Sequence, residues 1–577
     1  MLPPFRSLGY VHRMMTAGDR LGGSVCHSAD GFVDLRPLSL PDMLERATAA
    51  APDAPLIDFF GRVFTYREMA ALAGRVATGL AELGIRPGDR VGLYLPNVPY
   101  YVAAYHGALR LGAVVVNLSS GSSMEELRRQ IGDSGVRVVF TLAATGFLPK
   151  AMGLLADSAL EWLVVGSLSG CLTSGKAFFQ RFFGRGLLPM PPSDGRVSSF
   201  DELVANSGSV PRIGVDPMRD VALIQYSSGE GAARGAEFTH QALSANARQM
   251  GLLCPWRGTQ RPESDERMIC ALPLSTIFGQ GCVLNRIVVK GGQMVMLSFF
   301  RPTETIAAIR RTRANCLPAT PAMLRALLGH PGLTRMDLAS LDLCIVVGAP
   351  LPQALRERFE HFSDAQVVET YGLTEAGIVS CNPVDARGRP SPIDRALPAT
   401  QVALAHRDDP ERAPSPGEPG EIIIRGPQLM LSYRRGGTPF VEQEGRRWLR
   451  TGDIGSIDAA GRIHFVDHVA DTISVTGFRV YPSQIEAILC RHPAVEQALV
   501  AGMPDHYAGE LPKAFVTLAE GASATPDELR GWLNARVGKH EQLIDVEIRD
   551  ILPRDRRGRL DRRAVIRREN ALPTGSA

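Results

Sequence analysis

Blocks of apolar residues alternate with amphipathic stretches along the chain, and this pattern predicts buried strands alternating with helices. The clearest amphipathic stretch begins with a capping box, Thr65 with Glu68, and ends at Gly84. Its apolar residues recur at helical spacing: Met69, Leu72, Val76, Leu80 and Leu83. We therefore expect a helix across this stretch.

Continuous apolar runs, in contrast, predict strands that are buried on both faces. Such runs are Val91 to Leu95, Ala113 to Val116, Val221 to Ile224 and Leu343 to Val347. Val367 to Thr370 is expected to be the end of a further strand. Between the first two runs, residues 100–111 have the pattern of a second helix. Repeated strand, helix and strand units of this length favour an α/β fold with a mostly parallel sheet covered by helices.

Residues 176–188 have a different character, because four Phe residues alternate with basic residues ahead of a proline cluster. A basic, aromatic helix of this kind is suited to lie on an anionic bilayer surface. Most amphipathic helices instead dock their apolar face on their own domain. Both interpretations stay open: peripheral contact with a membrane, or packing against the protein itself.

The composition of the chain indicates its cellular compartment and gives no reason to expect some classes of partner. With 577 residues, 45% hydrophobic and 21% charged, the chain is long enough for several globular domains. A net charge of +3 gives no reason to expect a nucleic-acid partner. The nine cysteines form no close pairs, and Cys270, Cys344 and Cys490 lie in apolar runs, so we expect reduced, buried thiols. Without a signal peptide or an apolar stretch long enough to span a bilayer, a cytoplasmic location is expected, with the inner membrane face as the place of any peripheral contact.

The first candidate for chemistry is the turn that follows the strand at 221–224. This turn is rich in Ser and Gly: Ser227, Ser228, Gly229, Gly231 and Gly235. Such a turn exposes backbone N–H groups and hydroxyls, which suit a polyphosphate. An ordinary glycine-rich turn would have the same composition, so the neighbouring motifs must decide between the two.

Three further motifs follow in order. They are TyrGlyLeuThrGlu at 371–375, TrpLeuArgThrGlyAsp at 448–453 and GlyPheArgValTyrProSerGlnIleGlu at 477–486. Together with the turn, they resemble the adenylate-forming (AMP-binding) enzyme superfamily, most of all its long-chain acyl-CoA synthetases, from about residue 38 to 568. The resemblance implies a large N-terminal adenylate-forming domain at 35–468 and a small, mobile α+β domain at 469–577. A poorly defined extension, residues 1–34, would precede them.

The resemblance also implies a reaction in two halves that uses ATP, Mg²⁺ and CoA. A fatty acid, or another carboxylic acid, is first converted to acyl-AMP with release of pyrophosphate, and the acyl group then passes to CoA. Two alternatives stay open. The acceptor could be an acyl carrier protein or an intramolecular hydroxyl that closes a lactone. The chain could also be a catalytically weak homologue that binds a nucleotide or an acyl chain.

The same resemblance implies roles for individual residues. The residues expected to bind ATP or AMP are Ser227, Ser228, Gly229, Gly231, Arg234, Gly348, Ala349, Tyr371, Gly372, Asp453 and His468. Among these, Tyr371 would stack on adenine and Asp453 would accept the ribose hydroxyls. The catalytic set would be Thr374 at the α-phosphate, Glu375 as the Mg²⁺ ligand, and Arg559 between the acid and AMP. For the acyl pocket and the CoA path, the candidates are Thr276, Gly477 and Phe478.

Several of these positions depart from the family's pattern, mostly where it has a cation. The departures are Glu230 and Arg234 in the turn, His468, Ala470 and Ser474 around the hinge, and Arg559 near the end. Arginine retains the charge of lysine, but its planar fork aims the donors differently. Each lost donor at such a site costs about 10²–10³ in rate, so the substitutions predict slow adenylation.

Overall fold

The computed structural model describes residues 34–571 except 172–186, 193–194, 227–233, 253–261, 383–394, 408, 416, 459–461, 469–470, 472, 476–477, 506–508 and 556–559. Several predicted features therefore lie outside the described residues. They are the extension before residue 34, most of the basic aromatic stretch, the glycine-rich turn with Glu230, Ala470, Gly477 and Arg559.

Among the described residues, the first sheet of the large domain has eight strands. Their spatial order is β19 (Ser432–Tyr433), β9 (Gly235–Thr239), β8 (Val221–Tyr226), β4 (Val114–Asn117), β3 (Arg90–Leu93), β5 (Val136–Leu142), β6 (Trp162–Gly166) and β7 (Val197–Ser199). The pairs from β8 to β7 are all parallel, whereas β9 is antiparallel to both of its neighbours. The central strands are continuous apolar runs, as expected for a parallel sheet whose two faces are both covered by other elements.

Nine strands within the described ranges form the second sheet. Their order is β16 (Arg395–Ala396), β15 (Gly377–Cys381), β14 (Gln366–Leu373), β13 (Leu343–Val346), β12 (Cys316–Ala319), β10 (Arg267–Cys270), β11 (Gln293–Met296), β1 (Pro55–Phe59) and β2 (Arg62–Thr65). The run from β14 to β1 is parallel and the outer strands are antiparallel. The parallel α/β prediction is confirmed for both sheets.

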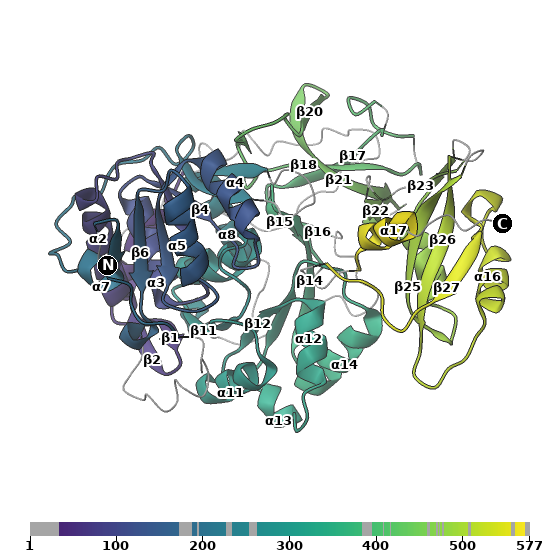
Figure 1. The fold of residues 1–577 in the computed structure, drawn as a ribbon, viewed down its shortest axis with the longest axis horizontal. Coiled ribbons are helices and arrows are strands. Elements are labelled where there is room, and N and C mark those ends of the chain that lie inside the picture. Colours follow the sequence, from purple (N-terminus) through teal and green to yellow (C-terminus); the bar gives the residue numbers. More distant parts are fainter. Residues whose placement is uncertain are drawn as a thin grey trace, which may run out of the picture.

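Helices fill the space around and between these sheets (Figure 1). In the large domain they are α1 (Leu40–Ala50), α2 (Tyr66–Glu82), α3 (Pro99–Arg110), α4 (Met124–Ser134), α5 (Leu148–Asp157), α7 (Phe200–Leu203), α8 (His240–Leu252), α9 (Ile277–Gly279), α10 (Arg286–Lys290), α11 (Pro302–Thr312), α12 (Pro321–Leu328), α13 (Arg335–Leu338) and α14 (Gln353–Ser363). Short 3-10 turns lie at η1 (Leu168–Cys171) and η3 (Glu263–Asp265), and a π-helix, η4 (Gln280–Asn285), joins α9 to α10.

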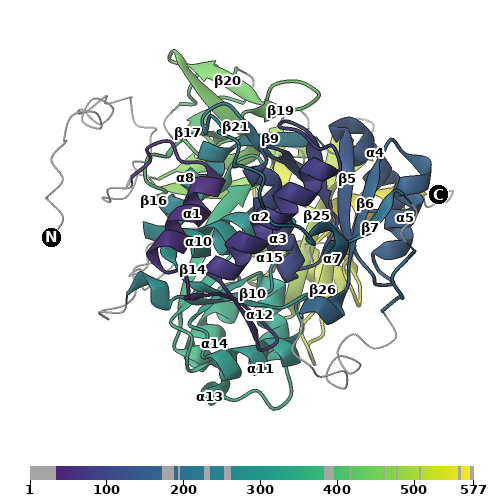
Figure 2. The same ribbon diagram turned by 90° about the vertical axis from the view of Figure 1, so that its left-hand side faces the viewer.

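Helix α3 is buried on every side, from Pro99 to Leu109. The Tyr101 hydroxyl lies 2.7 Å from Asn117 Oδ1 on β4 and 2.8 Å from the carbonyl of Leu274, which follows β10. The helix therefore packs between the two sheets, as an all-round apolar sequence requires. Seen from the side away from the C-terminal domain, α1, α2 and α3 lie in front (Figure 2).

Antiparallel strands complete the large domain. They are β17 (Gln401–Ala405), β18 (Gly420–Arg425), β21 (Arg446–Ile457) and β20 (Phe440–Gln443), with β22 (Ile463–His468) paired to β21. A separate sheet of the C-terminal domain consists of β24 (Phe478–Val480), β23 (Ile473–Val475), β26 (Gly509–Leu518), β25 (Val495–Asp505) and β27 (Asp545–Ile548). It carries α15 (Pro482–Leu489), α16 (Pro526–Asn534), η6 (Lys539–Glu541) and α17 (Arg562–Ala571), and it lies at one end of the molecule (Figure 1).

Local predictions can be compared directly with these elements. The capping box of Thr65 and Glu68 is confirmed at the start of α2, and the helix predicted at 100–111 corresponds to α3. The expectation that Val367 to Thr370 ends its strand is wrong, because β14 continues to Leu373 by pairing with β15. Cys270 and Cys344 are buried as expected, whereas Cys490 is exposed because it follows the last turn of α15.

Candidate active site

Strands β8 and β9 form a hairpin whose connection is the glycine-rich turn. The register pairs Tyr226 with Gly235, so the two ends of the turn lie side by side. The Tyr226 hydroxyl lies 2.6 Å from the Asp133 carboxylate at the end of α4. This contact anchors the first end of the turn to a helix of the same sheet.

Tyr371 and Asp453, from two separate motifs, meet across the site. The Tyr371 hydroxyl donates to Asp453 Oδ2 at 2.6 Å, although 82 residues separate them. Burial, followed by the neighbouring Asp453 charge, raises the pKa of Tyr371 well above its usual value. The hydroxyl therefore stays protonated and remains a donor to the carboxylate.

Asp453 lies in strand β21, where the pairing with β18 shifts register. The preceding Gly452 has a φ of +76°, a conformation that side-chain residues rarely adopt. Its N–H donates to Glu421 Oε1 at 3.0 Å, and Arg450 pairs with the same carboxylate at 2.6 Å. In the β21 and β22 ladder, Asp453 lies opposite His468, so the backbone brings these two predicted nucleotide-binding residues together. The His468 side chain lies outside the described atoms.

Thr374 and Glu375 occupy the turn between β14 and β15. The Glu375 carboxylate accepts a hydrogen bond from the Tyr433 hydroxyl at 2.7 Å, and the Glu375 carbonyl accepts one from the N–H of Met430 at 2.9 Å. Burial, followed by the Glu375 charge, raises the pKa of Tyr433, which keeps its hydroxyl a donor. The contact orients Oε1 and leaves Oε2 without a hydrogen bond to the described residues.

A divalent cation fits this arrangement. Mg²⁺ in nucleotide sites is commonly held by one or two carboxylates together with phosphate oxygens and water. The described residues contain no group of three or more His, Cys, Asp or Glu that could hold a metal by themselves. A single oriented carboxylate at Glu375 agrees with a metal that also depends on the nucleotide for ligands.

Tyr433 is a site residue that the sequence analysis missed. Besides contacting Glu375, its ring lies under the guanidinium of Arg234, with 5.3 Å from the guanidinium carbon to the ring centroid. The residue enters the site because β19 pairs with β9, which follows the glycine-rich turn. Its local sequence, SerTyrArgArg, carries no signal for this role, because the pairing joins segments almost 200 residues apart.

The remaining predicted residues lie after β13, before α9 and in two strands of the C-terminal domain. Gly348, with a φ of +83°, and Ala349 follow β13, and the Thr370 hydroxyl donates to the Val346 carbonyl at 2.8 Å. This bond brings the end of β13 beside the start of the TyrGlyLeuThrGlu motif. Thr276 caps α9 by accepting from the N–H of Gly279 at 3.1 Å. Of Phe478 and Ser474, only the backbone in their strands is described.

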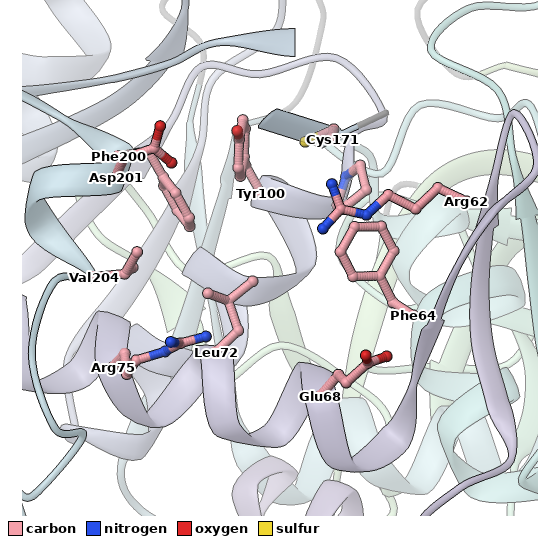
Figure 3. A pocket seen from close by; sticks show the side chains of 11 residues that line it. Arg62, Phe64, Glu68, Leu72, Arg75, Tyr100, Cys171, Phe200, Asp201 and Val204 are labelled. Atoms are coloured by element: carbon pink, nitrogen blue, oxygen red, sulfur yellow. The ribbon is translucent and has the colours of Figure 1, made fainter. Parts of the chain in front are cut away.

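A pocket elsewhere in the large domain is distinct from this site (Figure 3). Its lining residues are Arg62, Phe64, Glu68, Leu72, Arg75, Pro99, Tyr100, Cys171, Phe200, Asp201 and Val204. The Arg62 guanidinium lies 4.6 Å from the Phe64 ring centroid, and the Tyr100 and Phe200 rings pack 4.1 Å apart. None of the residues predicted to bind nucleotide, acid or CoA lines it, and its two arginines are balanced by two carboxylates.

Within the described ranges, no helix combines the length and the apolar character needed to cross a bilayer.

Comparison with known proteins agrees with the geometry. The family model of the AMP-binding enzyme matches residues 44–434, and that of the AMP-binding enzyme C-terminal domain matches residues 484–559. A long-chain-fatty-acid–CoA ligase of Bacillus subtilis (strain 168) is 31% identical, over 92% of this chain and 94% of that protein. A feruloyl-CoA synthase of an Amycolatopsis species is also 31% identical, over 91% and 97%.

Among solved structures, ATP-bound MatB of Rhodopseudomonas palustris superimposes with a TM-score of 0.78 at 25% identity, covering 92% of this chain and 99% of that one. The anthranilate CoA ligase AuaEII, in complex with anthranoyl-AMP, has the same fold, with a TM-score of 0.76 at 23% identity and coverage of 93% and 98%. The chain therefore belongs to the AMP-binding enzyme family and carries both the large and the C-terminal domain of that family.

Proposed function

We propose that this protein is an acid–thiol ligase that activates a carboxylic acid with ATP and transfers the acyl group to CoA. In the first half, an oxygen of the acid attacks the α-phosphorus of ATP and pyrophosphate leaves. In the second half, the CoA thiol loses its proton, the sulfur attacks the acyl carbon and AMP leaves. Curated relatives that are named as CoA ligases and match over nine-tenths of the chain support this reaction class.

The observation that carries the proposal is the 2.6 Å hydrogen bond between Tyr371 and Asp453. It joins the two family motifs that must converge on one nucleoside. In our proposal, Tyr371 lies against adenine with Gly348 and Ala349 behind it, and Asp453 accepts the ribose hydroxyls. The carboxylate already accepts one donor through Oδ2, which pre-orients it for this task.

Glu375 would hold Mg²⁺ in this site, and the ion would neutralise phosphate charge when bound. Thr374 is adjacent in the same turn and would donate to the α-phosphate. The cations of the reaction would be Arg234 and Arg559, and in both cases arginine stands where the family has lysine. We expect slower adenylation than in a relative with both lysines, by about 10²–10³ for each misplaced donor.

A fatty acid is our preferred substrate, because the first relatives compared are long-chain-fatty-acid–CoA ligases. An aromatic acid is the second candidate, supported by the feruloyl-CoA synthases. Four finer predictions also remain: a hinge at 468–471, a CoA path along 477–478, transfer to an acyl carrier protein in place of CoA, and membrane contact through residues 176–188.

The test is AMP formation from ATP by the purified protein, across a panel of fatty and aromatic acids, with and without CoA. Acid-dependent AMP that increases with CoA would establish the ligase and identify its substrate class. AMP that increases with an acyl carrier protein but not with CoA would change the acceptor. No AMP with any acid, while ATP still binds, would overturn the enzyme and favour a binding homologue.

A further inference from the structure

We propose that Tyr433 is a positioning residue that holds two charged groups of the site, the carboxylate of Glu375 and the guanidinium of Arg234, on one aromatic side chain. The proposal rests on the proposed function, because it assigns Glu375 to the metal and Arg234 to the phosphates. The two functions of Tyr433 use different atoms. The hydroxyl holds the carboxylate, and the face of the ring holds the cation.

The hydroxyl contact is short and directed. Tyr433 donates to Glu375 Oε1 at 2.7 Å, and both side chains are half-buried. Hydrogen bonds from neighbouring groups orient the side chains that ligate metals, and losing one typically costs 10–100-fold in metal affinity. A carboxylate held at one oxygen presents the other in a fixed direction.

The ring contact explains how an arginine can serve at the position of a lysine. Arg234 is exposed and forms no ion pair with the described residues, and its guanidinium lies 5.3 Å from the Tyr433 ring centroid. Stacking on an aromatic face restrains the side chain without neutralising its charge with a carboxylate. The cation therefore stays available to a polyphosphate at the adjoining turn.

The strand that carries Tyr433 is held in place by hydrogen bonds. Backbone hydrogen bonds join Leu431 N–H to the Glu237 carbonyl at 2.7 Å and Arg434 N–H to the Gly235 carbonyl at 2.8 Å. The Arg434 side chain adds a 2.7 Å bond to the carbonyl of Asp133. These bonds fix the backbone of β19 on the strand that leaves the glycine-rich turn, so the Cα of Tyr433 has a defined place beside that turn.

The two contacts can be separated by two substitutions. Tyr433→Phe removes the hydroxyl and retains the ring, whereas Tyr433→Leu removes both. We expect Tyr433→Phe to weaken Mn²⁺ binding by about 10-fold in the presence of a non-hydrolysable ATP analogue, with metal-free analogue affinity unchanged. Tyr433→Leu should show the same loss and also weaken metal-free analogue binding by about 3–10-fold, because Arg234 is released. Electron paramagnetic resonance titration of free Mn²⁺ and calorimetry of the analogue measure these two affinities.

Two controls make the result decisive. Tyr94→Phe removes a buried hydroxyl that contacts the carbonyl of Gly146, outside the site, and should leave both affinities unchanged. In a Glu375→Gln background, Tyr433→Phe should cause no further loss of Mn²⁺ affinity, because the two groups act as one unit. Circular dichroism of every variant shows that it is folded.

Unchanged Mn²⁺ affinity in Tyr433→Phe, or a full additional loss in the Glu375→Gln background, would overturn the proposal. Equal analogue affinity in Tyr433→Leu and Tyr433→Phe would overturn the part that concerns Arg234. Failure of the ligase is distinguishable from these outcomes. A protein that binds Mn²⁺ and the analogue through Tyr433 but forms no AMP with any acid would retain this inference and lose the proposed function.

Discussion

Asp453 and His106 show two opposite ways of burying a polar side chain. Asp453 is only 9% exposed, yet its carboxylate accepts from Tyr371, and the N–H of the preceding Gly452 donates to Glu421. His106, on α3, is 1% exposed, and within the described part of the chain neither ring nitrogen has a hydrogen-bond partner. A satisfied buried carboxylate is suited to bind a ligand, whereas an unsatisfied buried imidazole is tolerated only while it stays neutral.

Replacing Asp453 with Ala should weaken ATP binding by about 10–100-fold, because a buried carboxylate that accepts hydroxyl donors contributes about 1.5–3 kcal/mol. The loss should depend on the ribose. Inorganic tripolyphosphate, which has no ribose, should bind the variant and the wild type equally, and calorimetry measures both ligands. Unchanged ATP affinity would show that the nucleoside binds elsewhere.

His106 should make the fold sensitive to acid. Burial lowers its pKa from 6.5 to about 3, so between these values the unfolded chain binds a proton that the folded chain does not. Stability is therefore fully present above pH 6.5 and declines as the pH falls, by roughly 2–3 kcal/mol at pH 4.5. Urea unfolding at pH 7.5 and pH 4.5 should show a smaller decline for His106→Phe than for the wild type. Exposed His361→Gln is the control, and equal declines for wild type and His106→Phe would contradict the assignment.

At the scale of elements, a chain of buried polar side chains connects the strand before the glycine-rich turn to the segment after Thr276. Asn117 donates to Gln225 Oε1 at 2.8 Å, and Tyr101 donates to Asn117 Oδ1 at 2.7 Å. Gln280, the first residue of the π-helix η4, donates to the Tyr101 hydroxyl at 2.9 Å. The side chains of this series come from β4, β8, α3 and η4. Their hydrogen bonds therefore connect the ends of β4 and β8 with the segment that follows β10.

Replacing Asn117, a middle residue of this hydrogen-bonded series, should destabilise the large domain. Asn117→Leu removes the donor to Gln225 Oε1 and the Asn117 acceptor of the Tyr101 hydroxyl. The change should cost about 1–3 kcal/mol, because buried polar groups lose hydrogen bonds. The double variant Asn117→Leu, Gln225→Leu should be less destabilised than the sum of the single variants, since both partners of one bond are removed. Urea midpoints measure all three, and strict additivity would contradict coupling through this bond.

At the scale of the molecule, Arg562 ties together the parts of the C-terminal domain that adjoin the large domain. It begins α17 and contacts Asp471 between β22 and β23 at 2.5 Å, Glu486 on α15 at 2.7 Å and the Val500 carbonyl on β25 at 2.6 Å. The buried Asp467 of β22 accepts from the N–H of Ser483 at the start of α15. The connection between the two domains is therefore hydrogen-bonded to elements of the smaller one.

Arg562→Met should destabilise the C-terminal domain by about 3–5 kcal/mol, because two largely buried carboxylates lose their cation. Burial already raises the pKa of Glu486, and the Arg562 charge opposes that shift. Differential scanning calorimetry should show the C-terminal domain unfolding at a lower temperature. The exposed neighbour on the same helix, Arg563→Met, is the control. A thermogram that matches the wild type would contradict this role for Arg562.

Much of the fold could be predicted because its signals are local. The capping box at Thr65 depends on residues three positions apart, and the apolar run at 221–224 reads as a buried strand wherever it lies. Ordered motifs also located Tyr371, Glu375 and Asp453 before any coordinates. The end of β14 was mispredicted because its last three residues are held by pairing with β15, a partner that their composition does not indicate.

By itself, the sequence determined the order of strands and helices, the family and the chemical types of the candidate site residues, because each depends on spacing along the chain. Only the tertiary structure decided that Tyr371 reaches Asp453 and that Tyr433 joins Arg234 to Glu375. These contacts arise where segments that are far apart in the sequence, in part from different sheets, come together. Their geometry is set by the packing of whole sheets, which no pattern of neighbouring residues records.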